Sequence, residues 1–182
     1  MKLLIVRHGE TIENQNGIIQ GHLPGKLSEK GIQQAKKLAI RLKDEKLSVI
    51  FSSDLARAFD TSKIIAHYHP NSSIMTTALL RERSKGLHEG KYHKDIENFF
   101  DRDDIESKDS IMRRVKNFLE NIQRDYSEKS VLVVCHGGTI VALVANALNK
   151  SFDEVVEMRN IENTAITIFN PYPNLAAIAK KQ

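Results

Sequence analysis

The sequence predicts a three-layer α/β/α protein with a mostly parallel central sheet and helices on both faces. Short apolar, β-branched runs alternate along the chain with amphipathic stretches of helical spacing. Two of these runs, residues 2–6 and 130–135, lead into the same dipeptide, His-Gly, far apart in the sequence. An apolar run bounded by glycine is typical of a buried strand in a parallel sheet. With 182 residues and no linker or repeat, we expect one domain over residues 1–182.

Strands and helices are expected to alternate in the first half of the chain. The expected strands are residues 2–6, 47–51 and 73–76. The expected helices are residues 28–45 and a second one that ends near residue 67. Ser28 is the predicted N-cap of the first helix, and Ser53 or Asp54 is the predicted cap of the second.

A longer irregular segment, residues 79–92, is expected before the pattern resumes. The helices predicted after it are residues 94–100, 110–126 and 139–148. The run at 131–135 predicts a central strand. Residues 164–169 and 174–179 predict a final hairpin around Pro171.

Composition narrows the class of protein. Hydrophobic residues make up 41% of the chain and charged residues 27%, which is ordinary for a soluble globular protein. No apolar run is long enough to cross a membrane, and the first strand leaves no room for a signal peptide. The single cysteine, Cys135, cannot form an internal disulfide, so a cytoplasmic location is expected. The net charge is +4 without any nucleic-acid-binding motif, so no nucleic-acid partner is expected.

Polar residues that could form a site cluster at the predicted strand ends. Arg7 and His8 close the first strand, and His136 closes the run at 130–135. Arg57 lies in the first turn of the helix after the second strand, and Glu82 lies in the irregular segment. Candidates in the neighbouring loops are Asn14, Gln20, Gly21 and Gly137. Because ligands of α/β sheets bind at the carboxyl ends of the strands, these side chains are expected to share a small polar pocket.

The motifs that carry these residues resemble those of one known family. Arg7-His8-Gly9-Glu10-Thr11, together with Asn14, is similar to the signature of the histidine phosphatase superfamily, whose fold is phosphoglycerate-mutase-like. The other stretches that resemble family motifs, in the family's order, are residues 27–31, residues 52–58 with Thr61, Glu82, and Cys135-His136-Gly137. The resemblance runs from residue 3 to about residue 140. It implies phosphoryl transfer through a phosphohistidine.

The resemblance also implies a role for each candidate. His8 would be the nucleophile, since a neutral imidazole is available near neutral pH. Arg7 and Arg57 would hold the phosphate oxygens with planar, always-charged guanidinium groups, and His136 would add a further donor, most useful when protonated. Glu82 would protonate the leaving oxygen and then accept a proton from the attacking water. The residues expected to complete the binding site are Asn14, Gln20, Gly21 and Gly137. No metal or other cofactor is expected, because the site supplies its own positive charge.

The sequence favours a phosphatase of a small phosphorylated metabolite. Cofactor-dependent mutases of the family carry a longer, Arg- and Pro-rich insert between the acid and the second histidine, which this chain lacks. Gly86-Leu87-His88-Glu89-Gly90 resembles a stretch common in the phosphatases, with His88 in place of a tryptophan, and Glu106-Ser107 resembles a phosphatase element before a helix.

Two other readings stay open: a phosphoglycerate mutase with a trimmed lid, and a phospho-ligand binding module without catalysis. The binding module would be expected to lose His8 or Glu82, and both are present. The substrate and the oligomeric state are not predicted. His22 could line the rim of the pocket, and the other histidines are expected at the surface: His67, His69, His88 and His93.

Overall fold

A five-stranded sheet forms the centre of the computed structural model, which describes residues 1–96, 103–157 and 161–169. The strands are β1 (Lys2–Arg7), β2 (Val49–Ser53), β3 (Ser73–Thr77), β4 (Ser130–Cys135) and β5 (Ile166–Phe169). Their order in the sheet is β3-β2-β4-β1-β5, and only β5 runs antiparallel to its neighbour. The predicted mostly parallel sheet with a central β4 is therefore confirmed.

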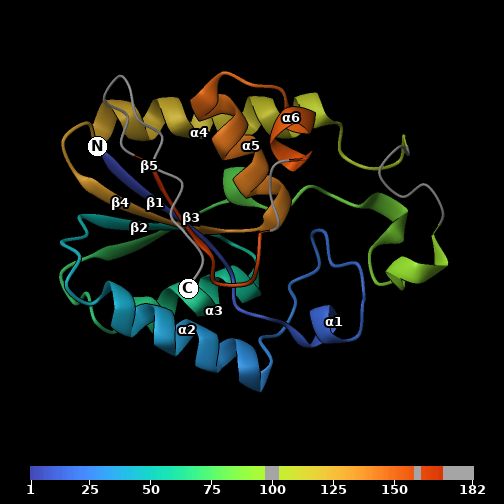
Figure 1. The fold of residues 1–182 in the computed structure, drawn as a ribbon, viewed down its shortest axis with the longest axis horizontal. Helices are drawn as coiled ribbons and strands as arrows, with labels where there is room; N and C mark the ends of the chain where they lie inside the picture. Colours follow the sequence, from blue (N-terminus) through green and yellow to red (C-terminus); the bar gives the residue numbers. More distant parts are fainter. Residues whose placement is uncertain (97–102, 158–160, 170–182) are drawn as a thin grey trace.

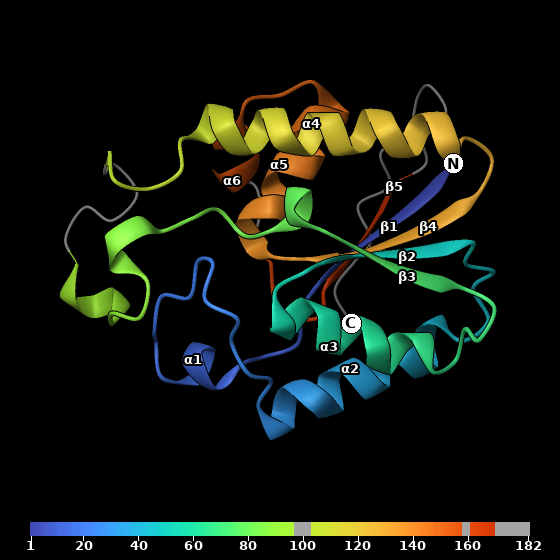
Figure 2. The same cartoon turned by 180° about the vertical axis from the view of Figure 1, so that it is seen from behind.

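Helices cover both faces of this sheet, as the sequence predicts (Figure 1). The helices on one face are α2 (Glu29–Leu42) and α3 (Ala56–Ala66); those on the other are α4 (Lys108–Asp125), α5 (Gly137–Leu148) and the short α6 (Phe152–Glu157). Seen from behind, the same two layers enclose the strands, and the one-turn helix α1 (Ile12–Gln15) lies beyond the strand ends (Figure 2). No helix in the described ranges is both long and apolar enough to span a bilayer.

The alternation of residues along the central strands builds two separate cores. On β1, Leu3 and Ile5 pack into the cluster under α4 and α5, whereas Leu4 and Val6 pack into the cluster under α2 and α3. Successive side chains of a strand point to opposite faces, so a strand that is covered on both faces must be apolar throughout. This requirement explains the unbroken apolar runs in the sequence.

The loop after β1 is fixed against the first turn of α2. Ser28 caps α2 by accepting a hydrogen bond from the Gly31 backbone N–H (3.0 Å), and its hydroxyl donates to the Glu10 carboxylate (3.0 Å). A Cβ atom at Gly31 would lie 1.9 Å from the Glu10 carbonyl oxygen, so only glycine fits. The stretch 27–31 thus holds in place the segment that follows His8.

Some element boundaries differ from the prediction. The second strand begins at Val49 rather than at residue 47. The N-cap of α3 is Leu55, not Ser53 or Asp54. The Ser53 hydroxyl accepts a hydrogen bond from the N–H of Leu55, the residue just before α3. The Asp54 carboxylate pairs with the Arg81 guanidinium (2.6 Å). Tertiary pairing therefore uses the side chain that local sequence would assign to a cap.

The end of the chain carries an element that the sequence did not predict. Helix α6 is only six residues long, too short to show a clear helical period.

Two other predicted elements lie partly outside the described residues. In place of the start of the helix predicted at 94–100, residues 93–95 form a 3₁₀ turn (His93–Asp95), and residues 97–100 lie outside the described residues. Likewise β5 confirms the first strand of the final hairpin, whereas its predicted partner, 174–179, lies outside the described residues.

Candidate active site

A cavity of about 460 Å³ opens at the carboxyl ends of β1 and β4. Eight of the nine predicted site residues line it: Arg7, His8, Asn14, Gln20, Gly21, Arg57, Glu82 and Gly137. The ninth, His136, is fully buried behind it, with its ring centroid 5.1 Å from that of His8. The sheet register explains this pairing. Because Arg7 lies opposite Cys135, the residue after each strand end emerges beside the other.

The His8 ring is held in one orientation and kept uncharged. Its Nδ1–H can donate to the Gly9 carbonyl oxygen (2.7 Å), which leaves Nε2 as the nitrogen without a proton. Burial lowers the pKa of His8 well below its ordinary value, and the nearby charges of Arg57 and Arg7 lower it further. A neutral imidazole with one unprotonated ring nitrogen is the form that a nucleophilic histidine requires.

The Arg57 guanidinium connects His8 to the loop opposite. Its Nε–H donates toward His8 Nε2 (3.3 Å), and its two terminal nitrogens donate to the backbone carbonyls of Gly21, Leu23 and Pro24. The side chain is 1% exposed, and burial lowers its pKa to about 10, so it stays charged at neutral pH. Arg57 therefore stabilises the loop at the cavity wall with several of its N–H donors. The sequence had suggested only that it would hold a phosphate.

Several buried polar atoms of the site have no hydrogen-bond partner within the described chain. They are Arg7 Nε, Gln20 Oε1 and both ring nitrogens of His136. Burial, then the charge of Arg57, lowers the pKa of His136 well below its ordinary value. His136 is therefore neutral in the free protein, unlike the protonated donor that the sequence suggested, and it offers one N–H. Two of these atoms are donors, Arg7 Nε–H and the single N–H of His136, whereas Gln20 Oε1 is an acceptor. Buried donors without partners are rare, and two of them beside the Arg57 guanidinium suit an anion with many acceptor oxygens.

Glu82 reaches the cavity from the segment after β3 and lies at the first turn of α5. Its carboxylate accepts from the Arg83 N–H (2.8 Å) and from the Gly138 N–H (3.3 Å). The His22 ring nitrogen contacts the Glu82 backbone oxygen (2.9 Å). His22 lies in the loop whose carbonyls Arg57 holds, so this loop supports the segment that carries Glu82.

Asn14 and Gly21 come from the long loop between β1 and α2. Asn14 completes a capping box with Thr11, in which its Oδ1 accepts from the Thr11 N–H (3.2 Å), so only its amide nitrogen is left for a ligand. Gly21 has φ +49°, and a Cβ atom there would lie 2.2 Å from the Glu89 carboxylate. That carboxylate accepts from the backbone N–H groups of His22 and Lys85. Glu89 therefore joins the two loops that frame the cavity.

The sequence analysis missed several residues that line the cavity. The basic and polar ones are Arg83, Lys85, Lys108, His93 and Asp153, and the apolar ones include Ile18, Ile19, Val141, Phe152 and Val156. Arg83 and Lys85 could have been predicted, because they lie close to Glu82 in the sequence. The apolar part of the lining could not, because Phe152 and Val156 belong to α6, which the sequence did not predict.

Two histidines that were predicted at the surface are buried. His88 is 5% exposed and its ring lies 2.7 Å from the Asp104 carboxylate, and His69 is 6% exposed. His67 and His93 are exposed as predicted, although His93 also borders the cavity. Within the described ranges, no three His, Cys, Asp or Glu side chains gather in a group that could hold a metal ion.

Gly138 offers a direct test of where Glu82 lies. A Cβ atom at residue 138 would come within 2.5 Å of Glu82 Oε1. Because that atom is the end of a flexible side chain, Gly138→Ala should fold normally but displace the carboxyl. We expect a loss of about 10–100-fold in kcat/KM for alkyl phosphates, on the scale of a misplacement of about 1 Å. Thermal unfolding should change little. Unchanged turnover of alkyl phosphates would contradict this position of Glu82.

Comparison with known proteins agrees with this fold. A family model described as "Histidine phosphatase superfamily (branch 1)" matches residues 3–181, and the chain belongs to that superfamily. The chain is 33% identical to phosphoglycerate mutase-like protein 4 of Arabidopsis thaliana, over 92% of this chain and 78% of that protein. It is 35% identical to phosphoserine phosphatase 1 of Hydrogenobacter thermophilus, over 75% of this chain and 71% of that protein.

A solved structure extends this likeness to three dimensions. The phosphoserine phosphatase of Entamoeba histolytica, in complex with 3-phosphoglyceric acid, superimposes with a TM-score of 0.83 at 26% sequence identity. The match covers 100% of this chain and 98% of that one.

Proposed function

We propose that the protein is a histidine-type phosphatase that hydrolyses a small phosphorylated metabolite through a phosphohistidine on His8. The observation that carries the proposal is a neutral His8, with Nε2 unprotonated, in a cavity that is also lined by the buried Arg57, the half-buried Arg7 and the Glu82 carboxyl group. Phosphoryl transfer requires positioning and neutralisation of the phosphate oxygens, together with an acid at the leaving group. Each requirement has a matching side chain.

The reaction has two steps. In the first, His8 Nε2 forms a bond to phosphorus, the P–O bond to the leaving group breaks, and Glu82 donates a proton to the departing oxygen. In the second, Glu82 accepts a proton from water, the water oxygen attacks phosphorus, and the N–P bond breaks to restore His8. Arg7, Arg57 and the His136 N–H stabilise charge on the phosphate oxygens, which is greatest in the transition state. Asn14, Gln20 and the backbone at Gly21 and Gly137 complete the phosphate-binding cradle.

The cavity supports a small substrate with a partly apolar or anionic body. A volume of about 460 Å³ lies at the lower end of the range for ligand pockets. Its lining includes four apolar side chains and three basic ones: Ile18, Ile19, Val141 and Phe152, and Arg83, Lys85 and Lys108. Relatives named as phosphoserine phosphatases support a phosphorylated metabolite as the substrate class. The cytoplasmic location and the single domain stay predictions from the sequence.

A phosphate-release screen tests the proposal. The purified protein is incubated with phosphomonoesters, among them phosphoserine, 3-phosphoglycerate and p-nitrophenyl phosphate, and free phosphate is measured without any bisphosphoglycerate primer. We expect phosphate release from at least one ester, and its loss in His8→Ala. The alternative, a phosphoglycerate mutase, would instead interconvert 3- and 2-phosphoglycerate once primed and release almost no phosphate. Specific binding of phosphate esters without turnover would indicate the binding module.

A further inference from the structure

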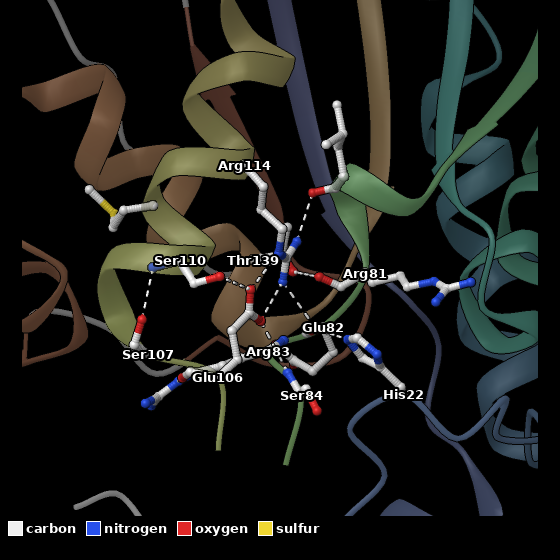
Figure 3. A network of polar contacts seen from close by, with 12 residues as sticks. His22, Arg81, Glu82, Arg83, Ser84, Glu106, Ser107, Ser110, Arg114 and Thr139 are labelled. Carbon is white, nitrogen blue, oxygen red and sulfur yellow. Dashed lines mark hydrogen bonds and ion pairs between the residues drawn. The ribbon is translucent and has the colours of Figure 1, made fainter. Parts of the chain in front are cut away.

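Side chains of two helices help to hold the segment that carries Glu82, in addition to its contacts with Asp54 and His22. It begins after β3 with a 3₁₀ turn, Ala78–Leu80, and passes α4 and α5 (Figure 3). The Thr139 hydroxyl on α5 donates to the Arg81 carbonyl oxygen (2.7 Å). On the α4 side, Arg114 donates from one terminal nitrogen to the Leu79 carbonyl oxygen (2.7 Å) and from the other to the Glu82 carbonyl oxygen (3.1 Å).

The Arg114 guanidinium is itself locked in place by Glu106. Arg114 Nε–H donates to Glu106 Oε1 (2.8 Å), and its second terminal nitrogen donates to Glu106 Oε2 (2.9 Å). The same carboxylate accepts from the Ser84 N–H (3.2 Å) and the Ser110 hydroxyl (3.1 Å). The two side chains are 17% and 13% exposed. A paired carboxylate and guanidinium at this depth form a fixed point, because neither group can leave the other without losing several hydrogen bonds.

The charge state of the pair suits this arrangement. Burial alone would raise the pKa of Glu106, but the hydrogen bonds and charge of Arg114 outweigh it, and the pKa lies below its ordinary value. Glu106 therefore stays ionised through the neutral range, and the pair stays intact. Neither Arg114 nor Glu106 lines the cavity, so neither group is placed to touch a substrate.

These hydrogen bonds hold the backbone before Glu82, at Glu82 and after it. Arg114 fixes carbonyls at the start of the segment and at Glu82 itself, and Glu106 fixes the N–H of Ser84 two residues further on. Each backbone contact lies within three residues of the acid. We propose that Arg114, locked by Glu106, is a positioning residue that places the Glu82 carboxyl at the leaving-group side of the cavity. The inference rests on the proposed function, in which Glu82 protonates the leaving oxygen.

The test compares two leaving groups in kcat/KM, which reports the first, phosphoryl-transfer step. An alkyl phosphate needs protonation of its leaving oxygen, whereas p-nitrophenyl phosphate departs almost without it. We expect Arg114→Met to lose about 30–100-fold with the alkyl ester and less than about threefold with p-nitrophenyl phosphate, on the scale of a misplacement of about 1 Å. Arg114→Lys and Glu106→Gln should show the same contrast at smaller size. Inhibition by inorganic phosphate should be unchanged in all three.

The matched control is Arg113→Met, which removes an exposed guanidinium from the neighbouring position of α4. It should leave both activities within about twofold, since surface substitutions usually have small effects. If Arg114→Met does not fold, as judged by thermal unfolding, Arg114→Lys and Glu106→Gln carry the comparison. Equal losses with both esters in the folded variants, or no loss, would overturn the inference.

A double variant ties the effect to Glu82. If Arg114 acts through Glu82, then Arg114→Met should add less than about threefold to the alkyl-ester loss of Glu82→Gln, because coupled residues are not additive. Independent, multiplied losses would overturn the inference and leave the proposed function intact. A Glu82→Gln variant that treats both esters alike would instead remove the acid role of Glu82, and with it both the proposed mechanism and this inference.

Discussion

Replacing His8 with alanine is expected to lower kcat/KM for every phosphomonoester by about 10⁴-fold or more, as loss of a nucleophile does in other enzymes that form covalent intermediates. The physical reason is that His8 lines the cavity beside Arg7 and Arg57, whereas His136 is fully buried and is not part of the lining. The measurement is steady-state turnover, combined with rapid quench of the wild type in base, where a phosphohistidine survives.

The site of the adduct is a sharper check than its presence. Because Nδ1–H faces the Gly9 carbonyl oxygen, phosphorus should be attached at Nε2. Phosphorus NMR of the labelled protein distinguishes the two ring nitrogens. His67→Ala serves as the control, since that ring is exposed at the end of α3, and its activity should be unchanged. An adduct at Nδ1, or on another residue, would contradict the assignment.

The pH profile follows from the same environment. Burial and the two arginines lower the pKa of His8 well below 6.5, so the nucleophile stays neutral as the solution is acidified through that value. The loss of kcat/KM that results from protonation of the free enzyme's His8 should therefore begin well below pH 6.5. In Arg57→Met, where one source of this shift is removed, the acid limb should move to higher pH.

Arg57→Lys is expected to cost about 10²–10³-fold in kcat/KM, although it keeps the charge. A lysine ammonium cannot reproduce the planar set of donors that reaches His8 Nε2 and the carbonyls of Gly21, Leu23 and Pro24. The loop that contains Gly21 should also loosen, since each buried carbonyl left without a donor costs about 1–3 kcal/mol. Faster amide exchange in residues 20–25, measured by mass spectrometry, would accompany the loss of activity.

The control for this substitution is Arg41→Lys, an exposed arginine in the last turn of α2. It should change neither turnover nor amide exchange. An Arg57→Lys enzyme with activity within about threefold of the wild type would contradict the central place of this guanidinium, since removing one such donor normally costs about 10²-fold or more.

The residues that the sequence placed best are those at strand ends. Arg7, His8 and His136 follow apolar runs, and the parallel register brings any two such ends together, so a local pattern sufficed to predict a long-range contact. Ser28 was equally predictable as a cap because its partner, Gly31, lies three residues away. In both cases the determining interaction is local or follows from the regular geometry of the sheet.

The sequence could not predict features that depend on irregular chain paths. Nothing near Glu82 shows that Arg114, 32 residues further on, holds its carbonyl oxygen. His88 was predicted at the surface, but it is buried with its ring beside the Asp104 carboxylate. The hydrogen bonds from Arg57 to the loop carbonyls are likewise not indicated by the sequence, which predicts only its role toward a ligand. Such contacts depend on how two loops meet, which has no periodicity to detect.

The pairing of β1 with strands from late in the sequence has a consequence for synthesis of the protein on the ribosome. This strand is made before both of its partners, β4 and β5, which come from residues 130–169. The backbone carbonyl oxygen of His8 accepts a hydrogen bond from the side-chain amide of Asn163, which lies 155 residues later in the sequence. Ribosomes add about 5–20 residues per second, so this apolar strand has no pairing partner for several seconds until β4 is made. A nascent chain therefore contains His8 well before the residues that surround it, so the proposed site can form only after β4 and Asn163 have been made.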